Sequence, residues 1–308
     1  MRYGTYPRKK TKLLIVIAGP TAIGKSALAI DIAKAIRTEI LCADSRQFYR
    51  EMEIGTSRLT EVEQEGIPHH FAGHLSIHEP YSAGQFETDA IKLLEKKFEQ
   101  HSALIICGGS GLYIDAVCRG FDSGIQGSPE VKSQIIESYK IKGLVWLQNE
   151  VKKNDLHFYQ KCDQMNPARL IRALEVFQTT GKPFSEFRKG LPEERSFRVL
   201  PLFLNEDRTE LYKRINSRVD KMMEMGFEEE AQRLIPYRNL PALQAIGYQS
   251  LFDSLEGKMK REEAVEKIKQ QTRNYAKRQI TWFNKDSKYH TFGPSEKQKI
   301  LNHIVEVL

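Results

Sequence analysis

The sequence predicts an α/β fold with a doubly wound parallel sheet, a helical insertion domain and a helical C-terminal region. An unbroken apolar run, Leu13 to Ala18, suits a strand that is buried on both faces of a parallel sheet. Strand-like and helix-like segments alternate after it, as they do in successive strand–helix–strand units. A charge-rich helical stretch, residues 129–187, then interrupts this alternation before a strand-like pattern returns at residues 197–204.

The other elements follow from the same patterns. Apolar residues at helical spacing predict helices over Ser26–Ile36 and Ala83–Glu99. The segments Glu39–Ala43 and Leu104–Cys107 have the short apolar pattern of buried strands. The chain after Leu204 is almost entirely helical. Its expected helices cover residues 208–225, 228–235, 244–255 and 261–283.

A helical stretch between two strands of one sheet is best explained as an insertion that forms a small domain of its own. Gly, Ser and Pro residues at 124–129 provide a loop at its start. We therefore expect residues 1–120 and 191–308 to form the α/β core with its C-terminal helices, and residues 121–190 to form the insertion domain.

Composition limits the class of protein. With 308 residues, 40% of them hydrophobic, the chain can bury one substantial core and a smaller appended domain. No apolar stretch approaches the ~20 residues that a membrane span needs, and the basic segment 1–12 lacks the apolar centre of a signal peptide. We therefore expect a cytoplasmic protein without a membrane partner. The net charge of +7 is compatible with a polyanionic ligand.

Neither the cysteine nor the histidine residues indicate a metal centre. The cysteines are scattered singly, which is typical of reduced thiols in an apolar core. They are Cys42, Cys107, Cys118 and Cys162. His69 and His70 stand together without a third ligand at a recognisable spacing, so we interpret them as structural.

Residues 19–26 match the G-x-x-x-x-G-K-[ST] pattern of a phosphate-binding loop between a strand and a helix. Glycines let the backbone curl so that several N–H groups face anionic oxygens, and the helix N-terminus adds positive potential. Lys25 would neutralise terminal phosphate oxygens, and the Ser26 hydroxyl would ligate Mg²⁺. The loop residues are Gly19, Pro20, Thr21, Ala22, Ile23, Gly24, Lys25 and Ser26. The core is therefore expected to be P-loop NTPase-like, but the loop alone does not identify the polyphosphate.

The carboxylate best placed for chemistry follows the second strand. Nucleotide-hydrolysing proteins of this class usually carry an Mg²⁺-orienting carboxylate after a later strand, but glycines follow Leu104–Cys107. Asp44 instead ends the second strand, and ligands of open α/β sheets bind at such strand ends. We expect Asp44 to lie near the phosphates and to meet a second substrate, with Ser110 bonded to a bridging oxygen or to Asp44. The simpler alternative for both residues is a turn or helix-cap role.

Six motifs occur in a fixed order along the chain. They are GPTAIGKS (19–26), DSRQFYREMEIGT (44–56), GGSGLY (108–113), RALEVFQTTGKP (172–183), AIGYQ (245–249) and YAKRQITWF (275–283). Together they resemble the motif set of the tRNA dimethylallyltransferase family. The resemblance implies Mg²⁺-dependent transfer of a dimethylallyl group from dimethylallyl diphosphate to a tRNA adenosine. The acceptor would be the exocyclic amine of the adenosine 3′-adjacent to the anticodon, in tRNAs that read codons beginning with U.

The same resemblance assigns roles to individual residues. Asp44 would be the general base, Ser110 would stand beside the reacting centre and Arg218 would bind the diphosphate. The insertion domain and the C-terminal helices would clasp the anticodon stem-loop, for which a monomer suffices. The expected tRNA contacts are Asp44, Ser45, Arg46, Gln47, Lys132, Arg169, Arg172, Gln244, Gly247, Lys277, Arg278 and Gln279.

The chain departs from the family pattern at a few positions. Ser110 replaces a threonine, and Glu53 and Arg58 replace aspartate and lysine with the charge retained. Ala168 stands where a polar or basic residue is expected, which removes the group for an RNA contact there. The aromatic residues of 261–283 recur at helical spacing, so packing on the core is the simpler interpretation for them than base stacking.

Three other functions fit parts of this pattern. Some relatives prenylate free AMP, ADP or ATP, but the basic insertion and C-terminal helices favour RNA as the acceptor. A small-molecule kinase would use Asp44 to bind the phosphoryl acceptor, but the sequence has no obvious compact arginine-rich lid. A non-catalytic RNA-binding protein is disfavoured because Lys25, Ser26 and Asp44 are all intact.

Overall fold

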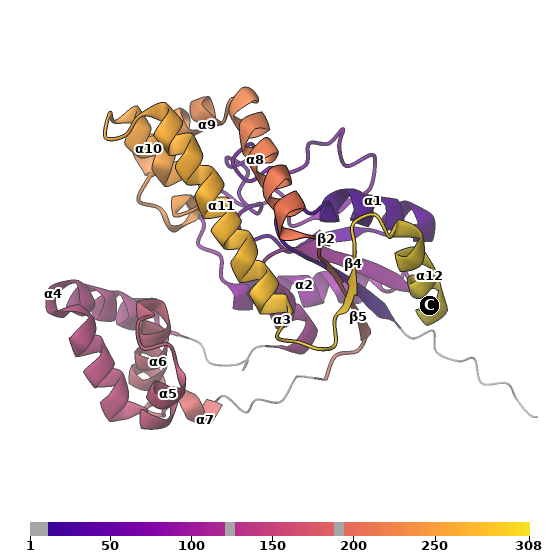
Figure 1. Ribbon diagram of the computed structural model, residues 1–308. Coiled ribbons are helices and arrows are strands. Elements are labelled where there is room, and N and C mark those ends of the chain that lie inside the picture. Colours follow the sequence, from indigo (N-terminus) through magenta and orange to yellow (C-terminus); the bar gives the residue numbers. More distant parts are fainter. Residues whose placement is uncertain (1–11, 121–126, 188–193) are drawn as a thin grey trace, which may run out of the picture. The chain divides into compact units, whose positions relative to one another are not determined.

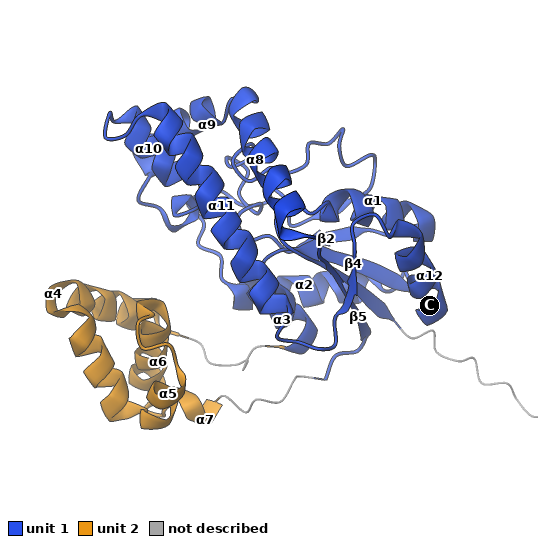
Figure 2. Ribbon diagram, in the orientation of Figure 1, with its two compact units in different colours: residues 1–119, 194–308 blue, residues 120–193 orange. Residues whose placement is uncertain are grey.

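The computed structural model describes residues 12–120, 127–187 and 194–308. The chain divides into two compact units, residues 1–119 with 194–308 (unit 1) and residues 120–193 (unit 2), which are described separately (Figure 2). The boundaries expected from the sequence lie within three residues of this division. Most of the basic segment 1–12 and the first half of the loop expected at 124–129 fall outside the described residues.

A six-stranded parallel sheet forms the centre of unit 1 (Figure 1). Its order is β3-β2-β4-β1-β5-β6. The strands are β1 (Leu13–Ala18), β2 (Ile40–Cys42), β3 (His69–His70), β4 (Ala103–Gly108), β5 (Arg198–Leu204) and β6 (His290–Phe292). Strand β1 pairs with β4 and β5 and is buried along its whole length, which explains its unbroken apolar sequence. The α/β fold with a P-loop NTPase-like core is therefore confirmed.

Alternate residues of β1 point into two apolar layers, one on each face of the sheet. Leu13 and Ile15 belong to one layer, and Leu14 and Val16 belong to the other. The first layer is covered by α1 (Lys25–Ile36), α8 (Arg208–Glu224) and α12 (Lys297–Val307), and the second by α2 (Ala83–Lys97) and α3 (Gly111–Arg119). The doubly wound arrangement follows from this two-sided burial.

A third apolar cluster joins the C-terminal helices of unit 1 to the segment after β2. It includes Met52, Phe227, Tyr248 and Ile268. The helices are α9 (Phe227–Leu234), α10 (Tyr248–Leu255) and α11 (Arg261–Phe283), which has the predicted bounds. Helix α10 begins four residues later than predicted, because residues 241–243 form a short 3-10 turn and Gly247 has a left-handed φ of 97°.

Unit 2 is helical, as its sequence pattern indicates. Its helices are α4 (Pro129–Asn154), α5 (Leu156–Lys161), α6 (Pro167–Thr180) and α7 (Phe184–Phe187). Helix α4 is broken at Gly143, whose φ of 75° is left-handed. Asp155 ties α5 to α7, because its carboxylate accepts hydrogen bonds from the amides of Phe158 (2.9 Å) and Ser185 (2.7 Å). The unit therefore has its own apolar core and its own polar link between helices.

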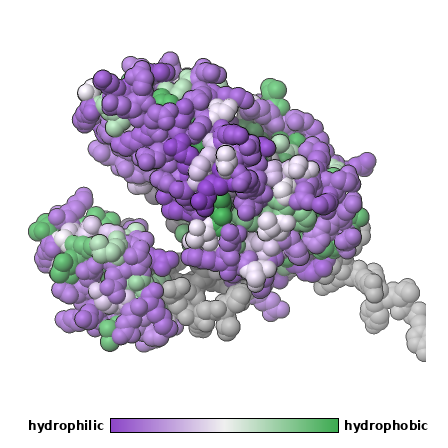
Figure 3. All heavy atoms as spheres, viewed as in Figure 1, coloured by the Kyte–Doolittle hydropathy of each residue, from purple (hydrophilic) through white to green (hydrophobic). Residues whose placement is uncertain are grey.

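The described surface is mainly polar. Figure 3 shows that apolar residues occupy only small patches on the face in view. Ile141 and Val145 are exposed apolar residues of unit 2. Among the described residues, every helix is too short or too polar to cross a membrane.

The central strand should be sensitive to small losses of volume. Val16→Ala should lower the free energy of unfolding by about 2 kcal/mol, because it removes two methyl groups from a fully buried site. The matched control is Val62→Ala, since Val62 is 86% exposed and the same change should stay within about 0.5 kcal/mol. Urea unfolding followed by circular dichroism measures both, and equal effects would contradict the assignment of β1 to the centre of the core.

Candidate active site at the carboxyl ends of the strands

The phosphate loop connects β1 to α1 and contains two positions, Gly19 and Gly24, that favour glycine. Gly24 precedes α1 with a left-handed φ of 100°. Gly19 lies against β5, where a Cβ would approach the carbonyl oxygen of Leu204 to 2.9 Å. The Lys25 ammonium folds back over the loop and donates a 2.8 Å hydrogen bond to the Pro20 carbonyl. The loop is thus already curled around the position expected for phosphate oxygens.

A pocket, here called the phosphate pocket, opens beside this loop. Its polar lining consists of Thr21, Lys25, Ser26, Asp44, Gln47, Gln64, His69, Arg58, Arg218 and Gln279. Burial lowers the pKa of Lys25 to about 8; nearby Arg218 acts in the same direction, whereas Cys107 and Asp44 oppose it. Lys25, Arg58 and Arg218 thus bring three cationic groups to one pocket, and burial disfavours the charged form of Lys25. An anionic ligand would offset this cost, so the pocket suits an anion.

Asp44 follows β2 and is half-buried, and it lines the phosphate pocket together with Lys25 and Ser26. Its Oδ1 accepts a 3.0 Å hydrogen bond from the Arg46 amide, so a turn role is present as well. Ser110 follows β4, and its Oγ accepts a 3.0 Å bond from the Ser45 amide and donates to the Ser45 hydroxyl at 3.3 Å. Ser110 therefore hydrogen-bonds to Ser45, the neighbour of Asp44. Among the described residues, no hydrogen bond joins Ser110 to Asp44 itself.

A second, larger pocket, here called the side pocket, lies next to the first. Thr21, Asp44 and Arg218 line both of them. The rest of its lining mixes polar groups with apolar ones, and comprises Ser45, Arg46, Gly55, Thr56, Ser57, Val219, Met222, Gln244, Ala245, Ile246, Ile268, Thr272, Tyr275 and Arg278. Asp44 therefore stands where a charged pocket meets a half-apolar one.

Arg218 reaches this junction from α8. Its Nε donates to the Ser57 hydroxyl at 2.9 Å and its Nη2 to the Thr56 carbonyl at 3.4 Å. Burial lowers the pKa of Arg218, while the charge of Asp44 opposes the shift. Since guanidinium remains protonated in proteins, the result is a fixed, poorly hydrated positive charge beside the phosphate loop.

Two of the residues expected to contact tRNA, Gln279 and Gly247, are buried in this structure. Gln279 is 4% exposed; its Oε1 accepts from the Thr21 amide at 2.9 Å and its Nε2 donates to the Gly109 carbonyl at 2.9 Å. It therefore ties α11 to the phosphate loop. Gly247 is buried against α9, where a Cβ would lie 2.7 Å from the ring of Phe227.

The other expected contacts of unit 1 line one of the two pockets or lie on α11. Ser45, Arg46, Gln244 and Arg278 line the side pocket, and Lys277 is exposed on α11. The Arg46 guanidinium holds the wall of that pocket by donating to the carbonyls of Pro241, Ala242 and Gln244 at 2.9–3.1 Å. Gln47 lines the phosphate pocket and donates to the Thr56 carbonyl at 3.1 Å.

In unit 2, Lys132 and Arg169 are exposed and Arg172 pairs with Glu175 at 3.0 Å. All three are on helical surfaces of the same small unit, on α4 or α6.

Sequence reasoning missed part of the lining. Tyr275 was assigned to packing, but it lines the side pocket, and burial followed by the charge of Asp44 raises its pKa. Thr56 and Ser57, which hold Arg218, directly follow the glycine of the EIG sequence. Their role was not apparent because the partner arginine is more than 160 residues away.

The described residues contain no group of three His, Cys, Asp or Glu side chains suited to a metal ion. His70 bonds to Glu39 at 2.6 Å, and the His69 Nδ1 lies 2.8 Å from the Ile67 carbonyl oxygen, so both have structural partners. A magnesium ion would have to rely on hydroxyl and phosphate oxygens, and the Ser26 hydroxyl lines the phosphate pocket.

The low pKa of Lys25 predicts a pH-dependent affinity for anions. In the free protein Lys25 is protonated below about pH 8 and neutral above it, so its contribution should fall as the pH rises. Inorganic pyrophosphate titrates too, so the useful quantity is the affinity of the wild type relative to Lys25→Arg, which stays charged. This ratio should fall roughly ten-fold from pH 7 to pH 9 in calorimetric titrations. A constant ratio would contradict the assignment.

Comparisons with known proteins identify the family of this chain. Residues 47–286 match the family model described as IPP transferase. A tRNA dimethylallyltransferase of Cytophaga hutchinsonii is 43% identical over 293 residues, covering 95% of this chain and 96% of the relative. One of Christiangramia forsetii is 44% identical over 293 residues, covering 95% of this chain and 97% of the relative.

Solved structures give the same result. The chain is similar to the tRNA isopentenylpyrophosphate transferase of Bacillus halodurans, with a TM-score of 0.71 and 32% identity over 96% of both chains. It is also similar to a eukaryotic dimethylallyltransferase acting on tRNA, with a TM-score of 0.80 and 28% identity over 92% of this chain and 74% of the other. Since the family model spans most of the chain and relatives above 40% identity span almost all of it, this chain belongs to the IPP transferase family.

Proposed function

We propose that this protein transfers a dimethylallyl group from dimethylallyl diphosphate to the exocyclic amine of the adenosine 3′-adjacent to the anticodon of tRNA. The acceptors are tRNAs that read codons beginning with U, and the products are N6-(dimethylallyl)adenosine and diphosphate. The observation that carries the proposal is the position of Asp44, which lines both the phosphate pocket and the side pocket. The names of the relatives, tRNA dimethylallyltransferases, support the reaction class.

The acceptor chemistry needs a base at this junction. An adenine amine is a poor nucleophile because its lone pair is delocalised into the ring. As its nitrogen forms a bond to the first prenyl carbon, the bond from that carbon to the diphosphate oxygen breaks and its electron pair leaves with diphosphate. Asp44 accepts the proton that the amine loses, which raises the reactivity of the amine as the bond forms.

The leaving group needs positive charge. The amides of the phosphate loop, Lys25 and Arg218 line one pocket and neutralise the charge that develops on the leaving diphosphate. Ser26 would hold Mg²⁺ together with diphosphate oxygens and water, an oxygen donor set that this ion prefers. When bound, Mg²⁺ supplies further neutralisation of the leaving group.

The adenosine must leave its stack to reach Asp44, and the side pocket is the place that we propose for it. Ser45, Arg46, Gln244 and Arg278 line that pocket, and Lys277 lies exposed on the same helix as Arg278. We propose that these residues, with Lys132, Arg169 and Arg172 of unit 2, contact the anticodon stem-loop. We also propose that the protein acts as a monomer in the cytoplasm, where tRNA is available as a substrate.

A transfer assay distinguishes this function from its alternatives. It offers radiolabelled dimethylallyl diphosphate with either an anticodon stem-loop that has consecutive adenosines or free AMP. With Mg²⁺ present, label should enter the RNA alone, and chelation of Mg²⁺ by EDTA should abolish transfer. Label in AMP would identify a nucleotide prenyltransferase, and label in neither would favour a kinase.

Asp44→Asn should lower the transfer rate by about 100-fold or more, because the carboxamide cannot accept the amine proton. The affinity for pyrophosphate, measured by calorimetry, should stay within about three-fold of the wild type, since the cationic groups of the phosphate pocket remain. A parallel loss of pyrophosphate binding would show that Asp44 supports the pocket instead of the proton transfer.

A further inference from the structure

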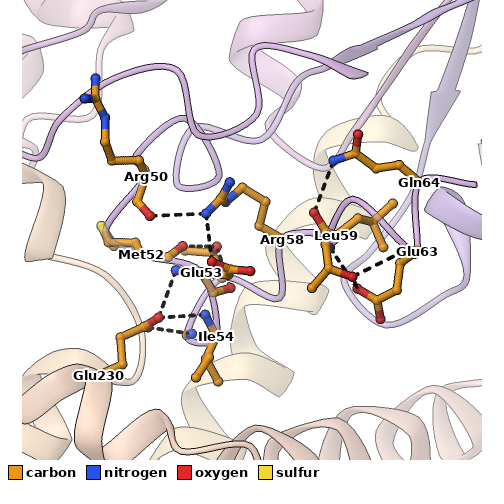
Figure 4. Close-up of polar contacts among 12 residues, drawn as sticks. Arg50, Met52, Glu53, Ile54, Arg58, Leu59, Glu63, Gln64 and Glu230 are labelled. Carbon is orange, nitrogen blue, oxygen red and sulfur yellow. Dashed lines mark hydrogen bonds and ion pairs between the residues drawn. The ribbon is translucent and has the colours of Figure 1, made fainter. Parts of the chain in front are cut away.

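Glu230 of α9 has a carboxylate that is buried among the residues of an apolar cluster. Figure 4 shows this carboxylate pointing at the backbone of Glu53 and Ile54. Glu230 is 3% exposed. Its Oε2 accepts hydrogen bonds from the amides of Glu53 (2.9 Å) and Ile54 (2.8 Å). Its Oε1 accepts from the amide of Gly55 (2.9 Å) and from the Tyr248 hydroxyl (2.7 Å). These four donors fill the four acceptor positions that a carboxylate has.

A buried carboxylate destabilises the fold unless all of its acceptor positions are hydrogen-bonded. A buried carboxylate loses its hydration, and bonds from converging backbone amides are what offset that loss. Three successive amides can point at one carboxylate only in a narrow range of loop conformations, so Glu230 selects one conformation of residues 53–55. The pKa of Tyr248 is raised by burial and then by the charge of Glu230, which keeps its hydroxyl a donor.

The contact between this loop and the helices is also sterically tight. A Cβ at Gly55 would lie 2.2 Å from the ring of Phe227 and 2.5 Å from the Tyr248 hydroxyl oxygen. Only glycine allows the loop to come this close to α9 and α10. The position of the loop is therefore set by shape as well as by hydrogen bonds.

The next two residues of the same loop hold Arg218. Thr56 accepts from the Arg218 Nη2 through its carbonyl and Ser57 accepts from the Nε through its hydroxyl. Gln47 braces the other side, because its Nε2 donates to the carbonyls of Thr56 (3.1 Å) and Ser57 (3.3 Å). A continuous set of contacts thus runs from Glu230 through residues 53–57 to the guanidinium beside the phosphate loop.

We infer that Glu230 is a positioning residue of the diphosphate site: it fixes the loop 53–57, which in turn orients Arg218. Glu230 itself lines neither the phosphate pocket nor the side pocket. The inference rests on the proposed function, in which Arg218 binds the diphosphate. Glu230 thus supports diphosphate binding through the loop 53–57 and Arg218 without lining a pocket itself.

A double-mutant cycle on the full-length chain tests this inference, with calorimetric binding of inorganic pyrophosphate in Mg²⁺ as the readout. Glu230→Gln places an amide NH₂ against backbone donors and should weaken pyrophosphate binding about ten-fold. In an Arg218→Ala background the same change should weaken binding less than about two-fold, because the group through which Glu230 acts is already gone. Glu229→Gln is the matched control, since this neighbour is exposed and should leave the affinity unchanged.

A purely structural role for Glu230 predicts additive losses in the two backgrounds, and additivity would overturn the inference. If Glu230→Gln does not fold, Tyr248→Phe takes its place in the cycle, because it removes one of the four donors and little volume. It should give the same non-additive pattern with a smaller loss. The cycle needs no prenyl transfer, so failure of the wild-type transfer assay would count against the proposed function alone.

Discussion

The site depends on how closely β2 and β4 approach each other at their carboxyl ends. A Cβ at Gly108 would lie 2.1 Å from the carbonyl oxygen of Ala43. The two strands can therefore approach this closely only because residue 108 has no side chain. The amide of Ala43 donates to Cys107 at 2.8 Å, and the amide of Ser110 returns a bond to Ala43 at 3.2 Å. Asp44 directly follows this close contact, and its carboxylate therefore lies beside the loop that follows β1. A bulkier residue at position 108 would move Asp44 away from the phosphate pocket.

Helices from the C-terminal half of the chain attach the remaining parts of the site to these strand ends. Gln279 joins α11 to both the phosphate loop and the segment after β4, and Arg218 joins α8 to the loop after β2. Each attachment is made by a side chain that hydrogen-bonds to backbone or hydroxyl groups of the core. Helix α11, which carries the exposed basic residues Lys277 and Arg278, is therefore connected through Gln279 to the loop proposed to hold diphosphate.

Local patterns predicted the elements and residues that are determined locally. Strand β1 is buried on both faces and α11 is long and regular, so both were found with correct bounds. Asp44 was found because a strand end in a parallel sheet has a known relation to ligands. Strand β6 has three residues at an edge, two of them exposed, and no alternation of three residues can indicate a strand.

The missed residues depend on partners that are distant in the sequence. The sequence predicts that a glutamine on a polar helix is exposed. Gln279 is buried because it contacts Thr21, which lies 258 residues earlier in the chain. Glu230 is the last of three consecutive glutamates, and nothing in their order shows that it alone turns inward toward a loop 175 residues away. The sequence could identify the chemistry of the site but not the contacts that support it.

The strand order has a consequence for biosynthesis. Strand β1, at the centre of the sheet, has β5 as one of its two neighbours, and that neighbour is translated about 180 residues later, after the whole of unit 2. During synthesis the edge of β1 that faces β5 has no partner until about two thirds of the chain has left the ribosome. Long-range pairing of this kind is slow, and unpaired apolar edges are prone to associate with other chains. Until β5 emerges, the nascent chain therefore exposes an unpaired edge of its central strand, whereas the helices of unit 2 contact one another locally and need no distant partner.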